Sequence, residues 1–116
     1  MARATLTTKA DEGSTYVVRA TYLDEDSNAV TPDSVVWTLT DGDGTIINSR
    51  EDVAVAVPST YNDIVLGAAD LKCSSGKDET RVLMLEYVYD SSAGNNLPGT
   101  AQVSFIVQKL QTVVAR

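Results

Sequence analysis

Two acidic runs carry the side chains most able to do chemistry in this 116-residue chain. Asp24-Glu25-Asp26 and Asp41-Gly42-Asp43-Gly44 each place two aspartates two positions apart. Calcium prefers several hard oxygen ligands of this kind. The second run lacks the glycine at loop position six and the glutamate at position twelve of an EF-hand, so that template is excluded. A calcium site of another kind at a loop end stays open, beside the simpler interpretation that these aspartates form turns.

Catalysis finds little support in the residue types present. The chain has no histidine, which removes the commonest general base at neutral pH and every Ser-His-Asp or Cys-His arrangement. The one cysteine, Cys73, lies between Lys72 and Ser74, where we expect an exposed or half-packed thiol rather than a nucleophile. Zinc-type sites built on cysteine and histidine are excluded by the same counts. We therefore predict a chain that is not an enzyme and uses no cofactor; a carboxylate-dependent enzyme is the weakest alternative.

Alternating apolar and polar residues predict the elements that position these turns. The clearest run is 34–40, in which Val35, Trp37 and Leu39 alternate with residues that point to the opposite face. A period-two run rich in β-branched residues and followed by an Asp-Gly turn predicts a strand that enters a hairpin. Trp37 is the only tryptophan, so we expect it to anchor the core.

The same pattern predicts further strands at 14–23, 45–48, 52–57, 61–66, 80–90 and 100–109, a weak strand or arm at 2–8, and one helical turn at 67–71. The segments 24–28, 73–78 and 91–99 are expected to be loops. The residues expected to face the core are Tyr16, Val18, Ala20, Tyr22, Val35, Trp37, Leu39, Ile64, Leu66, Leu83, Leu85, Tyr87, Tyr89, Val103, Phe105 and Val107. Val53, Val55 and Val57 are expected to share one face of their strand. About seven strands with frequent turns predict an all-β fold, a single immunoglobulin-like antiparallel β-sandwich.

Length and charge limit the class of protein further. We expect one domain over residues 1–116, with a possible N-terminal arm at 1–13 and a C-terminal tail at 110–116. A single cysteine cannot form an internal disulfide, and we expect aliphatic side chains near Ala20 and Leu85 to fill the space of the usual one. The net charge of −7 argues against nucleic acid and anionic membrane surfaces as partners. The N-terminus does not resemble a secretory signal, and no apolar run approaches the roughly 20 residues of a membrane span.

The outward face of the later strands is unusually apolar. Val36, Val82, Met84, Val88 and Ile106 all point away from the predicted core. Antiparallel sheets with one wet face usually alternate to polar residues there. Scattered exposed apolar residues are common, yet a contact surface for another subunit is the more informative interpretation. The tail adds a second candidate, so the predicted partner interface comprises Val36, Met84, Val88, Ile106, Val113 and Val114.

Several motifs along the chain resemble small immunoglobulin-like proteins of tailed bacteriophages, which are encoded among phage structural genes. The motifs are YVVRATYLDED (16–26), AVTPDS (29–34), VWTLTDGDG (36–44), ADL (69–71) and EYVYDS (86–91). The resemblance covers about residues 16–109. Ser27-Asn28, where glycine is more usual, and Cys73 depart from the pattern. The resemblance implies a virion component with no catalytic residues to carry over.

We therefore expect a capsid decoration or cement subunit that binds phage capsid proteins, possibly as a homo-oligomer, and resides in the virion after assembly in the bacterial cytoplasm. A head–tail connector or tail accessory protein, bound to tail proteins, is the alternative within this class. An immunoglobulin-like module for a host receptor or glycan is the alternative of another class. It would use the loops 24–28 and 91–98, although Tyr61 is the only aromatic residue that the pattern makes available to it.

Overall fold

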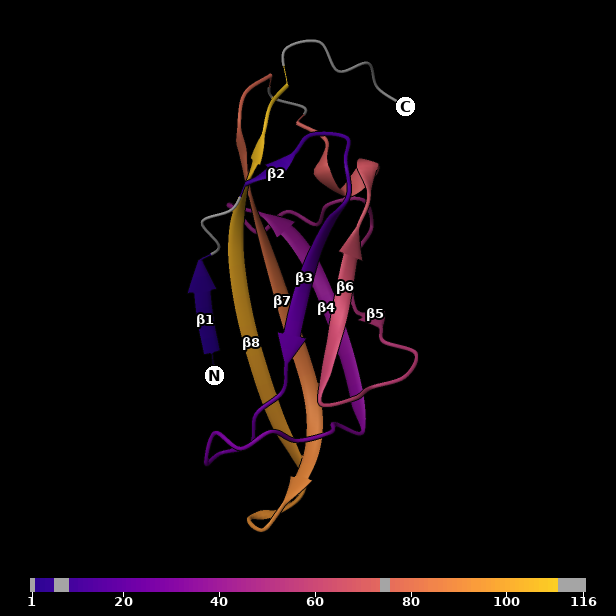
Figure 1. The fold of residues 1–116 in the computed structure, drawn as a ribbon, viewed down its shortest axis with the longest axis vertical. Helices are drawn as coiled ribbons and strands as arrows, with labels where there is room; N and C mark the ends of the chain where they lie inside the picture. Colours follow the sequence, from indigo (N-terminus) through magenta and orange to yellow (C-terminus); the bar gives the residue numbers. More distant parts are fainter. Residues whose placement is uncertain (1, 6–8, 74–75, 111–116) are drawn as a thin grey trace.

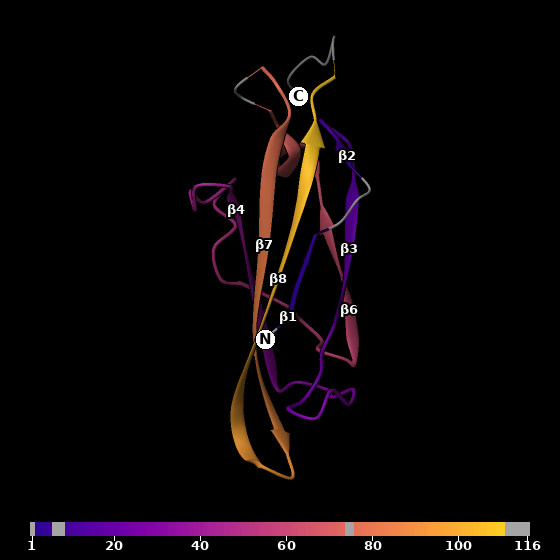
Figure 2. The same cartoon turned by 90° about the vertical axis from the view of Figure 1, so that its left-hand side faces the viewer.

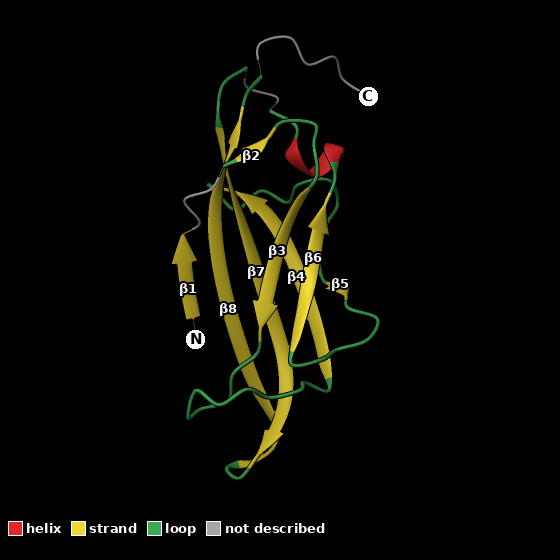
Figure 3. Ribbon diagram, in the orientation of Figure 1, coloured by secondary structure: helices red, strands yellow, loops and turns green. Residues whose placement is uncertain are grey.

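Strands make up nearly all of the regular structure, as Figure 3 shows. The computed structural model describes residues 2–5, 9–73 and 76–110. One 3-10 turn, η1 (Ala68–Leu71), interrupts the strands, where one helical turn was predicted. The strands are β1 (Ala2–Thr5), β2 (Ala10–Asp11), β3 (Tyr16–Thr21), β4 (Ser34–Asp41), β5 (Val53–Ala54), β6 (Tyr61–Leu66), β7 (Glu79–Ser91) and β8 (Gly94–Gln108). The prediction of an all-β chain is confirmed.

The strands form two sheets that pack as two layers. Sheet A has the order β1-β8-β7-β4-β5, and β2 also pairs with β8; sheet B contains β3 and β6. Figure 2 views the layers edge-on, with β4, β7 and β8 to the left of β3 and β6. The expectation of a wholly antiparallel arrangement is wrong for β1 and β2, because both run along β8 in the direction of β8 itself.

The core lies between the two layers and is built from alternate residues of five strands. Buried residues of β3, β4, β6, β7 and β8 form one hydrophobic cluster. The predicted inward faces of these strands are confirmed, with Tyr16 half-buried at the start of β3. Trp37 lies directly beside Leu85 in the β4–β7 ladder, and both Leu85 and Ala20 are buried. The tryptophan strand is therefore part of the core, as its alternation predicts.

Two predicted strands after β4 are shorter than expected. In place of a strand at 45–48 there is one bridge, between Thr40 and Ile46. Asn48 and Ser49 follow with φ angles of 53° and 56°, a left-handed conformation that interrupts the pairing. The backbones of Ile47 and Arg50 on either side both bond to Leu39 of β4. The strand predicted at 52–57 is limited to Val53–Ala54. Of the three valines predicted to share one face, Val53 and Val55 pack against the core, whereas Val57 is 76% exposed.

The hairpin of β7 and β8 is longer than the sequence pattern indicates. Residues 91–99 were expected to be a loop, but β8 begins at Gly94 and pairs with β7 almost to the tip. In Figure 1 this hairpin extends below the end of sheet B. Asp90 stabilises the turn, because its Oδ1 accepts a hydrogen bond of 2.8 Å from the backbone nitrogen of Asn96. Glycine at position 99 leaves room for the ring of its ladder partner Tyr87.

We expect Gly99→Ala to destabilise the fold by about 1–3 kcal/mol, the range typical of an overpacked core. A Cβ at position 99 would overlap the Tyr87 ring. The ring cannot move freely, because its hydroxyl donates a 2.8 Å hydrogen bond to the carbonyl oxygen of Leu23. Urea denaturation measures the change, and Gly67→Ala is the matched control because a Cβ there meets nothing within 4 Å. Equal stability of the two variants would contradict this account.

Candidate functional site

The side of β4, β7 and β8 that faces away from sheet B, here called the outer face, contains the described residues of the predicted interface. Val36, Met84, Val88 and Ile106 all occupy outward positions on these strands. The three strands are neighbours in one sheet, as the prediction requires. Met84 is 40% exposed and the other three are partly exposed. Val113 and Val114, the tail part of the predicted interface, lie outside the described residues.

The ladder register joins the apolar residues of the outer face into one diagonal line. Met84 pairs with Thr38 and so lies diagonally to Val36, two positions back on β4. By the same register Val88 and Val36 are diagonal neighbours, and so are Val82 and Ile106. Diagonal neighbours on a sheet are about 7–8 Å apart, within reach of long side chains. We call Val36, Val82, Met84, Val88 and Ile106 the apolar stripe.

Uncharged polar side chains flank the apolar stripe. They are Ser34, Thr38, Thr40, Thr80, Thr100, Gln102, Ser104 and Gln108. Pro98 also occupies an outward position and is apolar. At the outward positions of the rows that cross all three strands, Glu86 is the only charged residue, and Asp90 lies beyond Val88 toward the hairpin tip. At the edge beside β4, the backbone nitrogen of Asp52 donates a 3.1 Å hydrogen bond to the hydroxyl oxygen of Thr38. Among the described side chains of β4, β7 and β8, none on this face is basic.

The acidic loop 24–28 braces the long hairpin. The carboxylates of Asp24, Glu25 and Asp26 can lie within 4.8 Å of one another, which keeps the earlier calcium hypothesis geometrically open. Two of the three already have partners: Asp24 Oδ1 accepts backbone N–H groups at 2.9 Å within the loop. Glu25 accepts hydrogen bonds from the hydroxyls of Ser91 at 2.8 Å and Tyr89 at 3.2 Å. These bonds fix the loop against the hairpin without any ion.

The second acidic run also serves its own backbone. Asp41 Oδ1 accepts hydrogen bonds from the backbone nitrogens of Asp43 at 2.8 Å and Thr45 at 3.0 Å. A carboxylate that bonds the backbone two and four residues later is the usual reason for aspartate in a turn. The run is therefore accounted for as a turn after β4.

Tyr61 does not join the loops that a glycan site would use. It lies at the start of β6, on the outward face of sheet B, opposite Thr21. Arg19 lies with its guanidinium carbon 4.3 Å from the centre of the Tyr61 ring and forms a forked ion pair with Asp63. The arginine therefore occupies one face of the ring. Beside this group, Val17 and Val65 form an exposed cross-strand pair. The outward positions of both valines in the predicted strands were a signal that could have identified the pair.

The prediction of an exposed or half-packed thiol at Cys73 is wrong. Cys73 is buried, and its backbone nitrogen donates a 2.9 Å hydrogen bond to Glu12 Oε2. Burial raises the pKa of the Cys73 thiol, and the nearby carboxylates of Glu12 and Glu79 add to the effect, so the thiol is protonated at neutral pH. The polar sequence around Cys73 gave the opposite impression, but Lys72 is exposed while Leu71 and Cys73 on either side of it are buried.

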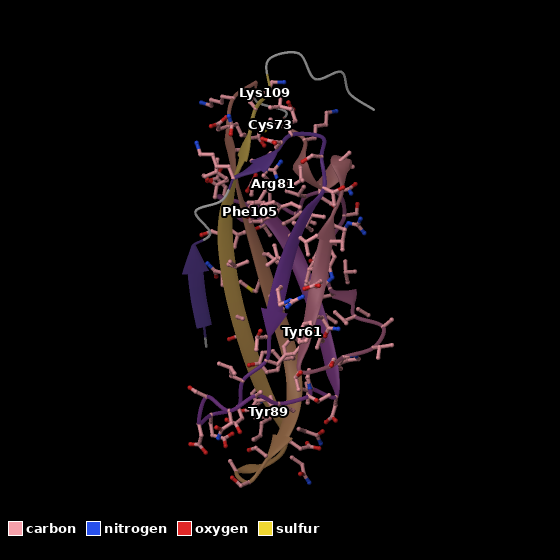
Figure 4. All side chains as sticks on the ribbon, in the orientation of Figure 1. Tyr61, Cys73, Arg81, Tyr89, Phe105 and Lys109 are labelled. Atoms are coloured by element: carbon pink, nitrogen blue, oxygen red, sulfur yellow. The ribbon has the colours of Figure 1, made fainter. Side chains whose placement is uncertain are left out.

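Glu12 connects three segments at the end of the molecule where Cys73 and Lys109 are labelled in Figure 4. Its Oε1 accepts a 2.9 Å hydrogen bond from Lys109 Nζ, and its backbone nitrogen donates to the carbonyl oxygen of Gln108. The hydrogen bond from Lys109 lowers the pKa of Glu12 in spite of its burial, and the Cys73 amide lowers it further. The carboxylate therefore joins β2, the segment after η1 and the end of β8. This is a structural role.

A second buried polar cluster lies beneath η1. Asp70 is buried and accepts hydrogen bonds from Arg50, Asn48 and the backbone nitrogen of Gly67. Arg81 is equally buried, and its guanidinium donates to the carbonyl oxygens of Asp70 and Lys72 as well as to Glu79. No buried side-chain nitrogen or oxygen in the described part of the chain lacks a partner. The cluster is thus complete without a substrate.

The described part of the chain contains no helix with the length and apolar character that crossing a membrane requires. Two exposed apolar surfaces of the described residues have no partner within the chain: the pair Val17 and Val65 on sheet B, and the larger outer face of sheet A, where an apolar stripe lies among uncharged polar residues. Comparison with known proteins adds no assignment: no protein-family model, no curated protein and no solved structure matches the chain.

Proposed function

We propose that this chain is a non-enzymatic structural protein of a tailed bacteriophage virion, and within that class a capsid decoration subunit. It would bind a preassembled protein shell through the outer face of sheet A. The motif resemblance at residues 16–109 supports the class of protein. The outer face supports the mode of action, and it is the observation on which the proposal depends.

The strand order supports the finer fold assignment that we propose, an immunoglobulin-like sandwich. In that fold strands C, F and G form one sheet, and strands B and E are neighbours in the other. The order β4-β7-β8 and the pairing of β3 with β6 correspond to these two groups. Trp37 takes the position of the core tryptophan on strand C, and Leu85 beside it stands where a disulfide would pack.

The composition of the outer face supports a protein contact. The cores of protein interfaces are depleted in charged residues and enriched in methionine and aromatic side chains. In a chain with 22% charged residues, the outward positions of the rows that cross β4, β7 and β8 contain one charge, Glu86. Met84, the most exposed member of the apolar stripe, lies near its middle. Thr38, Gln102 and the other flanking residues can exchange hydrogen bonds with a partner of almost any sequence.

The size of the outer face supports binding to a repeated lattice rather than to one isolated partner. Where all three strands pair, the face follows the 8 residues of β4. At about 3.3 Å per residue and 4.8 Å per strand, this is a face of roughly 350–400 Å². Stable interfaces bury about 800 Å² per partner, so a single contact of this size would be weak. A rigid shell that presents many equivalent sites compensates for weak single contacts.

We expect Met84→Lys to leave the domain folded and to prevent its incorporation into virions. The side chain is 40% exposed, so a lysine is tolerated in the free chain, but binding would bury its charge in the centre of the contact. The measurement is the amount of the chain in purified virions, by gel and mass spectrometry, with circular dichroism as the test of folding. Val65→Lys is the matched control, because Val65 is 58% exposed on the opposite sheet. Wild-type occupancy of Met84→Lys would refute the interface.

The same gel separates the two positions in the virion that the proposal allows. A decoration subunit is present in numbers comparable to the capsid protein, so its band should be abundant. A head–tail connector or tail accessory protein would give a scarce band. Absence of the chain from purified virions would overturn the proposed function.

A further inference from the structure

We infer that the outer face binds a protein different from this chain, and that the partner places a lysine or arginine side chain opposite Glu86. The inference rests on the proposed function and deepens it, because it states the chemistry of the surface that the outer face would meet. It follows from where the few charges near the apolar stripe lie.

Glu86 stands inside the candidate contact, not at its edge. It lies between Val36 on β4 and Thr100 on β8, and two residues along β7 from both Met84 and Val88. Any flat surface that covers Met84 and Val88 together also covers Glu86. The carboxylate would lose its water on binding, and a buried carboxylate without a counter-charge is strongly unfavourable.

The described side chains of the outer face supply no counter-charge. None of the described side chains on it is basic, and its surroundings add further acids, with Asp90 along β7 and Asp52 beside Thr38. Arg50 is the described basic residue closest to β4 in the sequence. Its side chain forms an ion pair with Asp70 and lies over the ring of Trp37. With no described cation beside Glu86, we assign the cation that compensates it to the partner.

A second copy of this chain fits the face poorly. A two-fold axis that brings two apolar stripes together passes over Met84, the middle of the stripe. If the axis runs along β7, each Glu86 meets the Glu86 of the other copy; if it runs across β7, each Glu86 meets Val82. The first arrangement is repulsive, and the second buries an unpaired carboxylate against an apolar side chain. The net charge of −7 on every copy opposes both arrangements.

A partner with a basic group at this position satisfies both features of the face. Its cation would pair with Glu86, and an uncharged surface around the cation would cover the apolar stripe. Phosphate-rich partners are repelled by the same acids, which makes a protein the suitable class. Because one ion pair contributes to the contact, binding should weaken as the salt concentration rises.

The experiment measures binding of the purified chain to phage particles assembled without it, by co-sedimentation at low and high salt. The variants are Glu86→Gln, Glu86→Lys and, as matched control, Asp26→Lys, which makes the same charge change on an exposed loop. We expect Glu86→Gln to bind several-fold more weakly and to lose most of the salt dependence. Glu86→Lys should bind at least about tenfold more weakly, which corresponds to about 1.4 kcal/mol. Asp26→Lys should bind like the wild type.

Three outcomes separate the inference from the proposed function. If the wild-type chain binds the particles and both Glu86 variants bind equally well, the inference is overturned and the proposed function stands. If the wild-type chain does not bind the particles, the proposed function fails, and the inference fails with it. Sedimentation velocity of the free chain gives the third outcome: a wild-type dimer that Met84→Lys dissociates would show that a second copy occupies the face.

Discussion

Replacing Trp37 with alanine is expected to lower the free energy of unfolding by about 3–5 kcal/mol, the range measured for large aromatic side chains removed from cores. Trp37 is 7% exposed and lies between Val53 and Leu85 in the ladders on either side. Its neighbours belong to a sheet and cannot collapse into the space that an alanine leaves. Natural domains are stable by about 5–15 kcal/mol, so the loss is a large part of the total.

The Trp37→Ala experiment needs a probe other than tryptophan fluorescence, because Trp37 is the only tryptophan. Far-ultraviolet circular dichroism during thermal and urea unfolding serves instead. The midpoint temperature should fall by roughly 10–25 °C. Val57→Ala is the control, because it removes an apolar side chain that is already in water, and it should change little. A midpoint for Trp37→Ala close to the wild-type value would show that the tryptophan is not the core anchor.

Alternation was enough to predict the two faces of the main strands, because one face of each strand packs against the other sheet. Val35, Leu39 and Phe105 are inside for this reason. Alternation did not predict the parallel pairing of β1 and β2 with β8, since such short strands carry too few residues to show a period. The strand segment 94–99 was missed because its Gly and Asn composition is that of a loop. Its pairing depends on the neighbouring strand β7.

The buried charges could not be predicted from local pattern either. Arg81 has the same parity as Leu83, so the alternation places it inward, yet an arginine at the end of a strand is ordinarily expected in water. It is buried because the carbonyl oxygens of Asp70 and Lys72 converge on its guanidinium, which only the folded η1 segment makes possible. The outward positions of the candidate interface residues were easier to predict. Val36 and Met84 required only the parity of two strands and the knowledge that those strands are neighbours.

Replacing Asp70 with alanine is expected to lower the free energy of unfolding by about 1–3 kcal/mol, as is typical when hydrogen-bond donors inside the fold lose their acceptor. The carboxylate accepts hydrogen bonds from Arg50 Nε at 3.0 Å, Asn48 Nδ2 at 2.9 Å and the Gly67 nitrogen at 2.9 Å. Alanine leaves these three donors without their acceptor. Urea denaturation at pH 7 measures the loss.

Asp63→Ala is the matched control for Asp70→Ala, because Asp63 also pairs with an arginine but on the surface. Exposed ion pairs contribute little, so this variant should remain close to the wild type. Equal losses in the two variants would show that the burial of Asp70 is not what makes its ion pair important.

The contribution of Asp70 should also depend on pH, in a direction that its surroundings determine. Burial raises the pKa of the Asp70 carboxyl, but the hydrogen bonds from Arg50, Asn48 and the Gly67 nitrogen outweigh it and leave the pKa below its usual value. A carboxyl whose pKa is lower in the folded state stabilises the fold above its unfolded pKa, about 3.9 for aspartate. That stabilisation is lost as the pH falls through the pKa of Asp70 in the folded state.

The stability difference between the wild type and Asp70→Asn should therefore be constant near neutral pH and shrink below about pH 4. A difference that grows on acidification would mean that burial dominates and that the carboxyl is protonated more readily in the folded chain.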